Sequence, residues 1–236
     1  MICGICGSKK IFMIGDGIKC YKCLSCGHLF KSVEESWSLD YYLENDYWWK
    51  GPELLLYNKM YLAFFEDSIN AIFGGKTLVV GDATGEFSVL LLRYFLAKGI
   101  KHEVVYNEVS DVCSKSFLAE VKNRLIGDIK RVLGGVVDQF DNVFCINVVE
   151  HLVDPSGVFA LIKDSLRMDG RLFIVTNDGD ALDAYKFLVC ERDHFNIFTR
   201  ESLSLLLDKA GFGFLLYFQS LFDHLFCVVK RKEEVS

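Results

Sequence analysis

The sequence predicts an α/β protein, with a doubly wound, mostly parallel sheet that ends in an antiparallel strand pair and is preceded by a small metal-binding module. Two observations favour the sheet. Short apolar runs alternate with helix-length amphipathic segments after residue 75, and the last two apolar runs lie close enough in the chain to pair. Two Cys-x-x-Cys pairs within the first 26 residues predict the module.

The composition is that of a folded chain with one large core. Of the 236 residues, 51% are hydrophobic, and 26 Lys+Arg against 32 Asp+Glu give a net charge of −6. An acidic chain lacks the basic footprint of a nucleic-acid binder, so nucleic acid is not favoured as a partner. The sequence contains neither an uncharged apolar run long enough to span a bilayer nor a secretory leader, so we expect a cytoplasmic protein without a membrane partner. Nothing in the sequence indicates an oligomeric state.

The N-terminal module, residues 1–31, is predicted to be a zinc ribbon. Its expected ligands are Cys3, Cys6, Cys23 and Cys26. A two-residue spacer lets both thiolates of one turn reach one Zn²⁺, and a closed all-cysteine site leaves no position for a substrate, so we expect a structural Zn²⁺. Cys20 and His28 are alternative ligands, less favoured because Cys20 lies on an apparent strand and His28 follows the second knuckle.

Residues 32–75 form the predicted connection to the main domain. Acidic and aromatic residues alternate there without a regular period, and Pro52 suits the first turn of a helix that ends before Gly74 and Gly75. We interpret the segment as an aromatic linker and an N-terminal helix. The aromatic residues either pack on the main domain or form a lid over a ligand.

The main domain, residues 76–232, is expected to contain seven strands separated by helices. The strands are predicted at residues 77–80, 103–106, 124–126, 142–146, 171–176, 212–218 and 225–229. Amphipathic helices are predicted at 87–95, from Pro155 to a stop at Gly170, and at 203–210. The alternation predicts a Rossmann-like, doubly wound sheet.

Three features fall at the carboxyl ends of consecutive predicted strands, where open parallel sheets bind ligands. The turn from Gly81 to Gly85 lets a ligand approach the backbone, Glu108 is suited to a ribose diol, and Asp128 can accept a hydrogen bond from an exocyclic amine. Together they predict a nucleoside pocket. The spacing Gly-x-Ala-x-Gly differs from the six-residue dinucleotide fingerprint, which argues against NAD.

From about residue 76 to 230 the chain resembles the class I S-adenosylmethionine-dependent methyltransferases. The matching segments are 78–87 (LVVGDATGEF), 147–155 (NVVEHLVDP), 166–172 (LRMDGRL) and 194–199 (HFNIFT), followed by 210–212 (AGF). The resemblance implies that the methionine part of the cofactor contacts Gly81, Asp82, Ala83, Thr84 and Gly85. It also implies that Glu108 binds the ribose, that Asp128 and Ile129 contact the adenine, and that Asn147 lies near the sulfonium.

Two positions depart from the family pattern. The family usually has an acidic residue where Val79 stands and glycine where Ala83 stands. We expect Asp82 to replace part of the missing carboxylate. The extra methyl group of Ala83 is tolerable if that residue keeps a negative φ, but it narrows the pocket. The N-terminal knuckles resemble the zinc ribbon of sugar C-methyltransferases, although those enzymes usually carry a further C-terminal domain.

Methyl transfer to a hydroxyl or a carbon acid requires the removal of a proton, and histidine is the natural base near neutral pH. His151 and His194 are therefore the candidate catalytic residues, although either could have a structural role instead. Glu150 could orient His151 or help to bind a divalent ion.

The leading hypothesis is an S-adenosylmethionine-dependent methyltransferase of a small molecule, such as a saccharide or another biosynthetic intermediate. One alternative is an RNA methyltransferase that uses the zinc ribbon to bind its substrate. Another is a non-catalytic binding protein that retains the fold, which the residues Val79 and Ala83 favour.

Overall fold

The computed structural model describes residues 1–14, 19–32, 52–70, 75–109, 121, 123–181, 183, 184, 186, 188, 193–221 and 223–232. The chain divides into two compact units, one of Met1–Trp37, Cys145–Lys163 and Arg171–Ser236, the other of Ser38–Phe144 and Asp164–Gly170. Within the described residues, no helix combines the length and the apolar character needed to cross a membrane.

The strands are β1 (Ile11–Met13), β2 (Cys20–Cys23), β3 (Leu29–Lys31), β4 (Gly75–Val80), β5 (His102–Glu108), β6 (Asn123–Ile126), β7 (Phe140–Ile146), β8 (Leu166–Asn177), β9 (Asn196–Ile197), β10 (Phe212–Leu221) and β11 (His224–Arg231). The helices are α2 (Pro52–Phe64), α3 (Glu66–Asn70), α4 (Glu86–Ala97), α5 (Ile129–Leu133), the 3₁₀ turn η3 (Val149–His151), α6 (Pro155–Ser165) and α8 (Arg200–Lys209).

Seven strands form the main sheet in the order β10-β11-β8-β7-β4-β5-β6. β4, β5 and β6 pair in parallel, whereas β11 runs antiparallel to both β8 and β10. This confirms the predicted doubly wound sheet with a C-terminal antiparallel pair. The chain builds outward from β4 to β6 and then returns to β7 on the other side of β4, so the strand order reverses at β4 and β7.

The predicted strands are all present, with longer bounds than the apolar runs suggested. One helix boundary was wrong: α6 ends at Ser165, and Gly170 lies within β8. Leu166 is fully buried as the first residue of the strand. It could extend the apolar stripe of a helix equally well, so periodicity alone did not locate the boundary. The proposed aromatic lid lies mostly in 33–51, outside the described residues.

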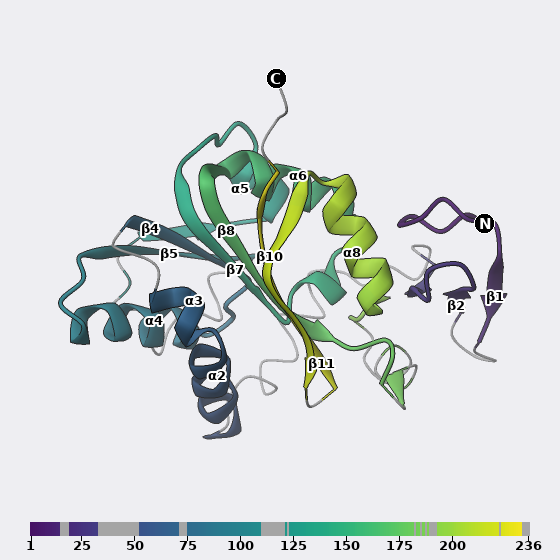
Figure 1. Cartoon of the computed structure of the whole chain (residues 1–236), viewed down its shortest axis with the longest axis horizontal. Helices are drawn as coiled ribbons and strands as arrows, with labels where there is room; N and C mark the ends of the chain where they lie inside the picture. The colour runs from purple at the N-terminus through teal and green to yellow at the C-terminus, as the bar shows by residue number, and fades with distance from the viewer. Residues whose placement is uncertain are drawn as a thin grey trace. The chain divides into compact units, whose positions relative to one another are not determined.

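The second unit packs its helices around an aromatic core. In Figure 1, α2, α3 and α4 lie together beside β4 and β5. The ring of Phe144 from β7 contacts Phe65 at 6.1 Å and Phe87 at 5.4 Å between centroids. On α2, the amide of Asn58 donates to the Glu86 carboxylate of α4 at 3.0 Å. These contacts fix the N-terminal helix against the helix that follows the Gly81–Gly85 loop.

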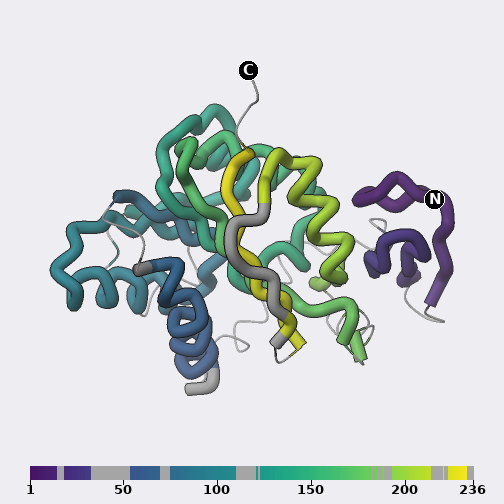
Figure 2. Tube along the Cα trace, in the orientation of Figure 1, coloured from purple at the N-terminus to yellow at the C-terminus, as the bar shows by residue number. Residues whose placement is uncertain are grey.

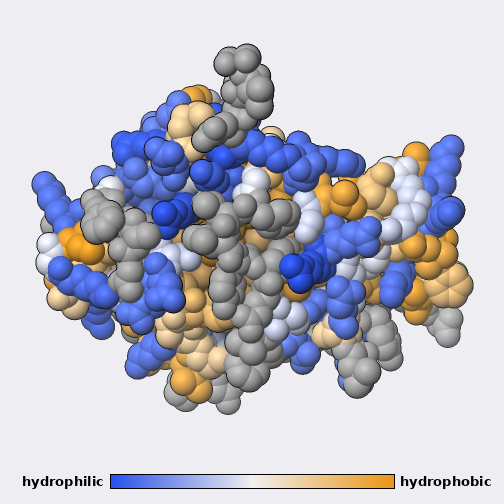
Figure 3. Space-filling view, viewed as in Figure 1, coloured by the Kyte–Doolittle hydropathy of each residue, from blue (hydrophilic) through white to orange (hydrophobic). Residues whose placement is uncertain are grey.

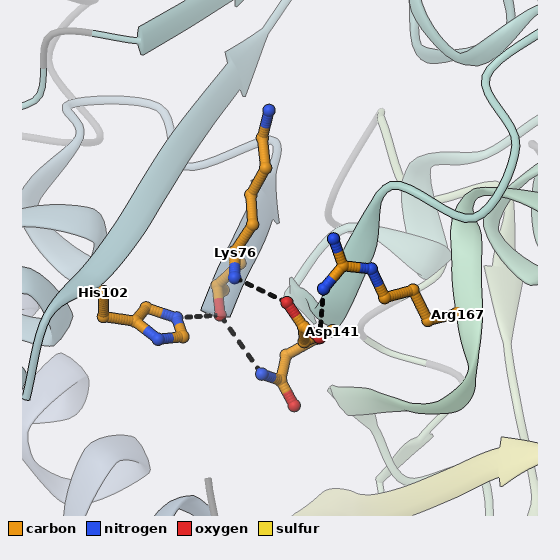
Figure 4. Close-up of polar contacts among 6 residues, drawn as sticks. Lys76, His102, Asp141 and Arg167 are labelled. Atoms are coloured by element: carbon orange, nitrogen blue, oxygen red, sulfur yellow. Dashed lines mark hydrogen bonds and ion pairs between the residues drawn. The ribbon is translucent and has the colours of Figure 1, made fainter. Parts of the chain in front are cut away.

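The amino ends of β4, β5 and β7 share a polar cluster (Figure 4). Asp141 accepts hydrogen bonds from the main-chain N–H of Lys76 at 2.7 Å and from Arg167 at 2.8 Å. Beside it, His102 lies 2.7 Å from the hydroxyl of Thr77. This edge is opposite to the one where parallel sheets bind ligands, so we assign the cluster a structural role.

In the first unit the N-terminal module, residues 1–31 (the ribbon), forms one sheet with β9. Its strands form a four-stranded sheet in the order β1-β2-β3-β9, and the register places Leu29 opposite Ile197. Thr199, two residues beyond β9, donates from its hydroxyl to the carbonyl of Cys26 at 2.8 Å. The same Thr199 caps α8, which runs into β10 and packs against it (Figure 2). The ribbon is therefore part of this unit.

Apolar side chains reach the surface of the ribbon. Ile2, Phe12, Met13 and Leu24 are all more than half exposed, and the region of β1 and β2 is partly orange in Figure 3. A module of about 30 residues cannot bury all its apolar residues, so we expect metal binding and β9 to supply much of its stability.

Asp82 caps the start of α4. Its carboxylate accepts from the main-chain N–H of Ser88 at 2.7 Å and of Phe87 at 3.2 Å. Burial raises the pKa of Asp82 to about 7, with a smaller contribution from the charge of Glu108, although the two hydrogen bonds oppose the shift. The folded protein therefore binds a proton at Asp82 over a pH range in which the unfolded chain has released it.

The cap at Thr199 gives the first testable prediction. We expect Thr199→Ala to lower the free energy of unfolding by about 1–2 kcal/mol, because α8 loses its cap and the carbonyl of Cys26 loses its donor. Thr199→Ser, which keeps the hydroxyl, should retain most of the stability. Urea unfolding followed by circular dichroism measures both. Equal losses in the two variants would show that the hydroxyl does not contribute.

The raised pKa of Asp82 gives the second testable prediction. Between about pH 4 and pH 7 the folded state holds the Asp82 proton more tightly, so this residue makes stability fall as the pH rises. We expect the unfolding free energy of the wild type minus that of Asp82→Asn to decrease by an amount on the order of 2 kcal/mol from pH 5 to pH 8. Urea unfolding at both pH values measures the difference, and a constant or rising difference would contradict the prediction.

Candidate functional site

The loop between β4 and α4 turns through three residues with positive φ. Gly81 has φ 62°, Ala83 39° and Gly85 78°. The condition of a negative φ at Ala83 is therefore not met. A side chain in this region costs on the order of 1 kcal/mol, so the surrounding contacts must hold Ala83 in place.

Two residues of β5 hold Ala83. The Glu108 carboxylate accepts from the main-chain N–H of Ala83 at 2.9 Å, and the Tyr106 hydroxyl donates to the Ala83 carbonyl at 2.7 Å. Glu108 also accepts from the N–H of Val109 at 2.7 Å, and it is buried. Both polar groups of the Ala83 backbone are thus bound from the neighbouring strand, which fixes the loop beside Glu108.

The end of β6 lies next to the same carboxylate. Ile126 pairs with Glu108, and the N–H of Gly127 donates to the Glu108 carbonyl at 2.9 Å. The Asn107 side chain donates to the carbonyls of Leu125 and Gly127. Asp128 then caps α5 through the N–H of Lys130 and is exposed, whereas Ile129 is buried.

The structure therefore brings together the Gly81–Gly85 loop, Glu108 and the Gly127–Ile129 turn. A carboxylate fixed by main-chain donors beside a loop of small residues fits a ribose diol, and the turn after β6 offers an acceptor at Asp128 and an apolar contact at Ile129 for a base. These residues suit an adenosyl group.

Asn147 belongs to the other unit: it follows β7, has φ 51°, and donates its N–H to the Val175 carbonyl at 2.8 Å.

The two candidate catalytic histidines lie together in the first unit. The rings of His151 and His194 are 4.8 Å apart, edge to face, although 43 positions separate them in the chain. The Nδ1 atom of His151 lies 3.1 Å from the main-chain oxygen of Asp193 and 3.3 Å from its carboxylate. Both neighbours are acceptors, so a hydrogen on Nδ1 can donate to them.

A second carboxylate belongs to this cluster. Glu150 is 1% exposed and accepts from the hydroxyl of Thr176 at 2.9 Å, while its carbonyl accepts from the N–H of Phe195 at 2.8 Å. One ligand-type atom from each of Glu150, His151 and His194 lies within 4.8 Å of the others. Buried carboxylates and imidazoles that converge in this way can bind a proton, a cation or an acceptor hydroxyl.

The pKa values in the cluster reflect the burial and the proximity of these groups. Burial raises the pKa of Glu150, although the charge of His151 opposes the shift. Burial alone would lower the pKa of His151, but the hydrogen bond to Asp193 and the charge of Glu150 raise it above its ordinary value. Burial would likewise raise the pKa of Asp193, yet the contact with His151 lowers it.

The sulfur atoms of Cys3, Cys6, Cys23 and Cys26 converge within 4.8 Å of one another. The Cys3–Cys26 and Cys6–Cys23 sulfur separations are 3.8 and 3.5 Å. Zn–S bonds of about 2.3 Å in a tetrahedron place sulfurs about 3.8 Å apart, so the spacing fits Zn²⁺. Burial would raise the pKa of Cys23, but main-chain N–H groups of Cys26 and Ser25 lower it to about 7.

The two alternative ligands have other positions. Cys20 is buried in an apolar cluster with Leu29 and Ile197. His28 stacks between Phe30 and Phe198, with Nδ1 3.8 Å from the Cys3 sulfur and Nε2 3.2 Å from the Asn196 amide oxygen. Among the described residues, the converging group contains the four knuckle cysteines without His28 or Cys20.

Sequence reasoning missed three residues that shape these sites. Tyr106 and Asp193 each orient a predicted site residue, and Asn196 connects His28 to the carbonyl of Leu152. Asp193 directly precedes His194, and this adjacency was a usable signal for a paired carboxylate. Tyr106 occupies a strand position that no motif distinguishes from core residues, whereas Asn196 lies within the matched segment 194–199, which did not reveal its contacts.

Comparisons with known proteins agree with this geometry. The methyltransferase domain family matches residues 64–215, more than half of the chain. A ubiquinone biosynthesis O-methyltransferase of Glaesserella parasuis serovar 5 is 26% identical over 160 residues, which are 60% of this chain and 63% of that protein. The chain thus spans less than two thirds of the curated relative that it matches.

Solved structures share the fold. A SAM-dependent methyltransferase from Archaeoglobus fulgidus has a TM-score of 0.59 and 16% identity, covering 81% of this chain and 99% of that one. CalO1, a methyltransferase in calicheamicin biosynthesis solved in its SAH-bound form, has a TM-score of 0.60 and 17% identity, covering 82% and 61%. By the matched family and by this fold, the chain belongs to the class I S-adenosylmethionine-dependent methyltransferases.

Proposed function

We propose that the protein transfers a methyl group from S-adenosylmethionine to a small-molecule acceptor, a saccharide or another biosynthetic intermediate, and that its ribbon binds a structural Zn²⁺. The observation that carries the proposal is the Glu108 carboxylate, held by main-chain N–H groups beside the Gly81–Gly85 loop. S-adenosylmethionine supplies an electrophilic methyl group on a sulfonium. The protein has to bind the adenosyl part, align the acceptor and remove its proton.

Each predicted cofactor residue has a distinct part in this proposal. The loop residues Gly81, Asp82, Ala83, Thr84 and Gly85 would contact the methionine part, Glu108 the ribose, and Asp128 and Ile129 the adenine. Asn147 is proposed near the sulfonium. His151 and His194 would act at the acceptor side, where the reacting proton has to be removed.

Two kinds of observation favour a small acceptor. The matched relatives include enzymes whose names place them in ubiquinone and calicheamicin biosynthesis. In addition, the chain has a net charge of −6 and so lacks the excess of basic residues that is typical of RNA-binding proteins. We therefore expect no salt-dependent RNA affinity, and a steep salt dependence would favour the RNA alternative.

The cofactor proposal predicts a specific loss on Glu108→Gln. The substitution keeps the shape of the side chain but removes the charge of the carboxylate, which accepts from the N–H of Ala83 and would accept from the ribose hydroxyls. We expect the Kd for S-adenosylmethionine, measured by calorimetry on the zinc-loaded protein, to rise at least about tenfold, which corresponds to about 1.4 kcal/mol.

Glu103→Gln is the matched control, because Glu103 lies on the same strand at its opposite end, where it contacts Lys76. This variant should bind the cofactor like the wild type. If the folded wild-type protein releases no binding heat at millimolar cofactor, the methyltransferase proposal fails.

The zinc proposal predicts a loss of bound metal on ligand substitution. We expect about one chelator-resistant zinc per chain in the wild type, and its loss with reduced thermal stability in Cys6→Ser. Cys20→Ala, a cysteine from β2 outside the converging group, should keep its zinc. Elemental analysis after dialysis measures both variants. Zinc retained in Cys6→Ser and lost in Cys20→Ala would reverse the ligand assignment.

A further inference from the structure

The cluster of Glu150, His151 and His194 has the chemistry of a second, open metal site. We propose that these three side chains bind one divalent cation through a carboxylate oxygen of Glu150, Nε2 of His151 and a ring nitrogen of His194. The site is separate from the cysteine cluster of the ribbon, because it shares no residue with it.

The positions of the three residues carry the first step. Glu150 and His151 are adjacent on η3, and His194 comes from the segment before β9. Their ligand atoms all lie within 4.8 Å. Two atoms bound to one ion at about 2.1 Å lie about 3–4 Å apart, so side-chain movements of less than about 2 Å close the site around an ion.

The orientation of His151 carries the second step. Its Nδ1–H faces the main-chain oxygen and the carboxylate of Asp193, at 3.1 and 3.3 Å. A hydrogen bond of this kind is the contact that most metal-binding histidines make through the ring nitrogen that does not bind the ion. Asp193 therefore acts as a positioning residue for a ligand.

Charge carries the third step. Glu150 and Asp193 bring two carboxylates to the cluster, and Glu150 is 1% exposed. Buried carboxylates are stabilised by a nearby cation, and with neutral imidazoles a divalent ion would balance two negative charges.

The backbone around the cluster is already fixed. The N–H of Phe195 donates to the Glu150 carbonyl at 2.8 Å, and the Asn196 amide donates to the Leu152 carbonyl at 2.6 Å. The two residues that follow His194 are thus bound to Glu150 and to Leu152, the residue after His151. A site held in this way binds an ion without a large ordering cost.

A donor set of two histidines and one carboxylate suits Mn²⁺, Fe²⁺, Co²⁺ or Zn²⁺ and leaves coordination positions for water or an acceptor oxygen. An ion here would lower the pKa of an acceptor hydroxyl. With the ion bound, His151 and His194 serve as its ligands and do not act as the base. The hydroxyl proton passes to bulk water, and the oxygen bonds to the methyl carbon as the carbon–sulfur bond breaks. This use of the ion rests on the proposed function and favours an acceptor that carries a hydroxyl group. The binding of the ion does not depend on the proposed function.

A cavity of about 330 Å³ in the same unit offers space for a small molecule near this segment. Its lining includes Val153, Phe195 and Asn196 from the histidine side and Ile5 and Phe30 from the ribbon. Pockets of this size accept small organic ligands.

The test uses Mn²⁺, which prefers carboxylate and imidazole ligands to the thiolates of the ribbon. Full-length protein that has been treated with chelator and retains only its chelator-resistant zinc is titrated with Mn²⁺, and the free ion is followed by electron paramagnetic resonance. We expect one saturable site in the wild type and at least about tenfold weaker binding in Glu150→Gln and in His194→Gln. Asp193→Asn should also weaken binding, because it removes the carboxylate that orients His151.

Glu103→Gln serves as the control and should bind Mn²⁺ like the wild type, and circular dichroism and zinc content verify that each variant is folded. If a variant does not fold, a rise in the thermal midpoint of the wild type with Mn²⁺ tests the site independently. No saturable binding in the wild type, or unchanged binding in both Glu150→Gln and His194→Gln, overturns the inference.

Calorimetry with S-adenosylmethionine separates the two proposals. If the protein binds the cofactor but not Mn²⁺, the proposal of a metal site is refuted and the proposed function stands. If it binds Mn²⁺ but not the cofactor, the proposed methyltransferase function is refuted and the metal site stands.

Discussion

The hydrogen bond from the Ala83 N–H to the Glu108 carboxylate is the constraint on which the cofactor site depends. Ala83 adopts a positive φ that an L-residue avoids, so the loop keeps its shape only while β5 holds it. Tyr106 binds the carbonyl of the same residue. One carboxylate therefore does two things: it fixes the loop, and it faces the place where a ribose is expected. This coupling explains how a chain with alanine at this position retains the turn.

The ribbon depends on the main domain in a comparable way. Residues far apart in the chain meet where β3 pairs with β9, where Thr199 binds the Cys26 carbonyl, and where His28 binds Asn196. The segment that contacts the ribbon also carries Asp193 and His194. If Zn²⁺ binds the four cysteines as proposed, its loss would act on the histidine cluster through this backbone pairing as well as on the N-terminal module itself.

The histidine cluster is a group of interacting acidic and basic side chains, not one isolated histidine base. His151 lies between the two carboxylates of Glu150 and Asp193, with His194 at its edge. Such an arrangement stabilises positive charge, whether a proton or a metal ion. The raised pKa of His151 and the lowered pKa of Asp193 are two consequences of that charge distribution.

The sequence by itself determined the α/β class, the seven strands, the cysteine knuckles and the acid at the end of β5, because apolar periodicity and short ligand spacings are local properties. It did not determine the φ of Ala83, the end of α6 or the partners of His151. These three features depend on contacts between residues that are far apart in the chain. Glu108 meets Ala83 from the next strand, and His194 meets His151 across 43 positions of the chain. Backbone strain and side-chain pairing are decided by such tertiary contacts, which a linear pattern does not encode.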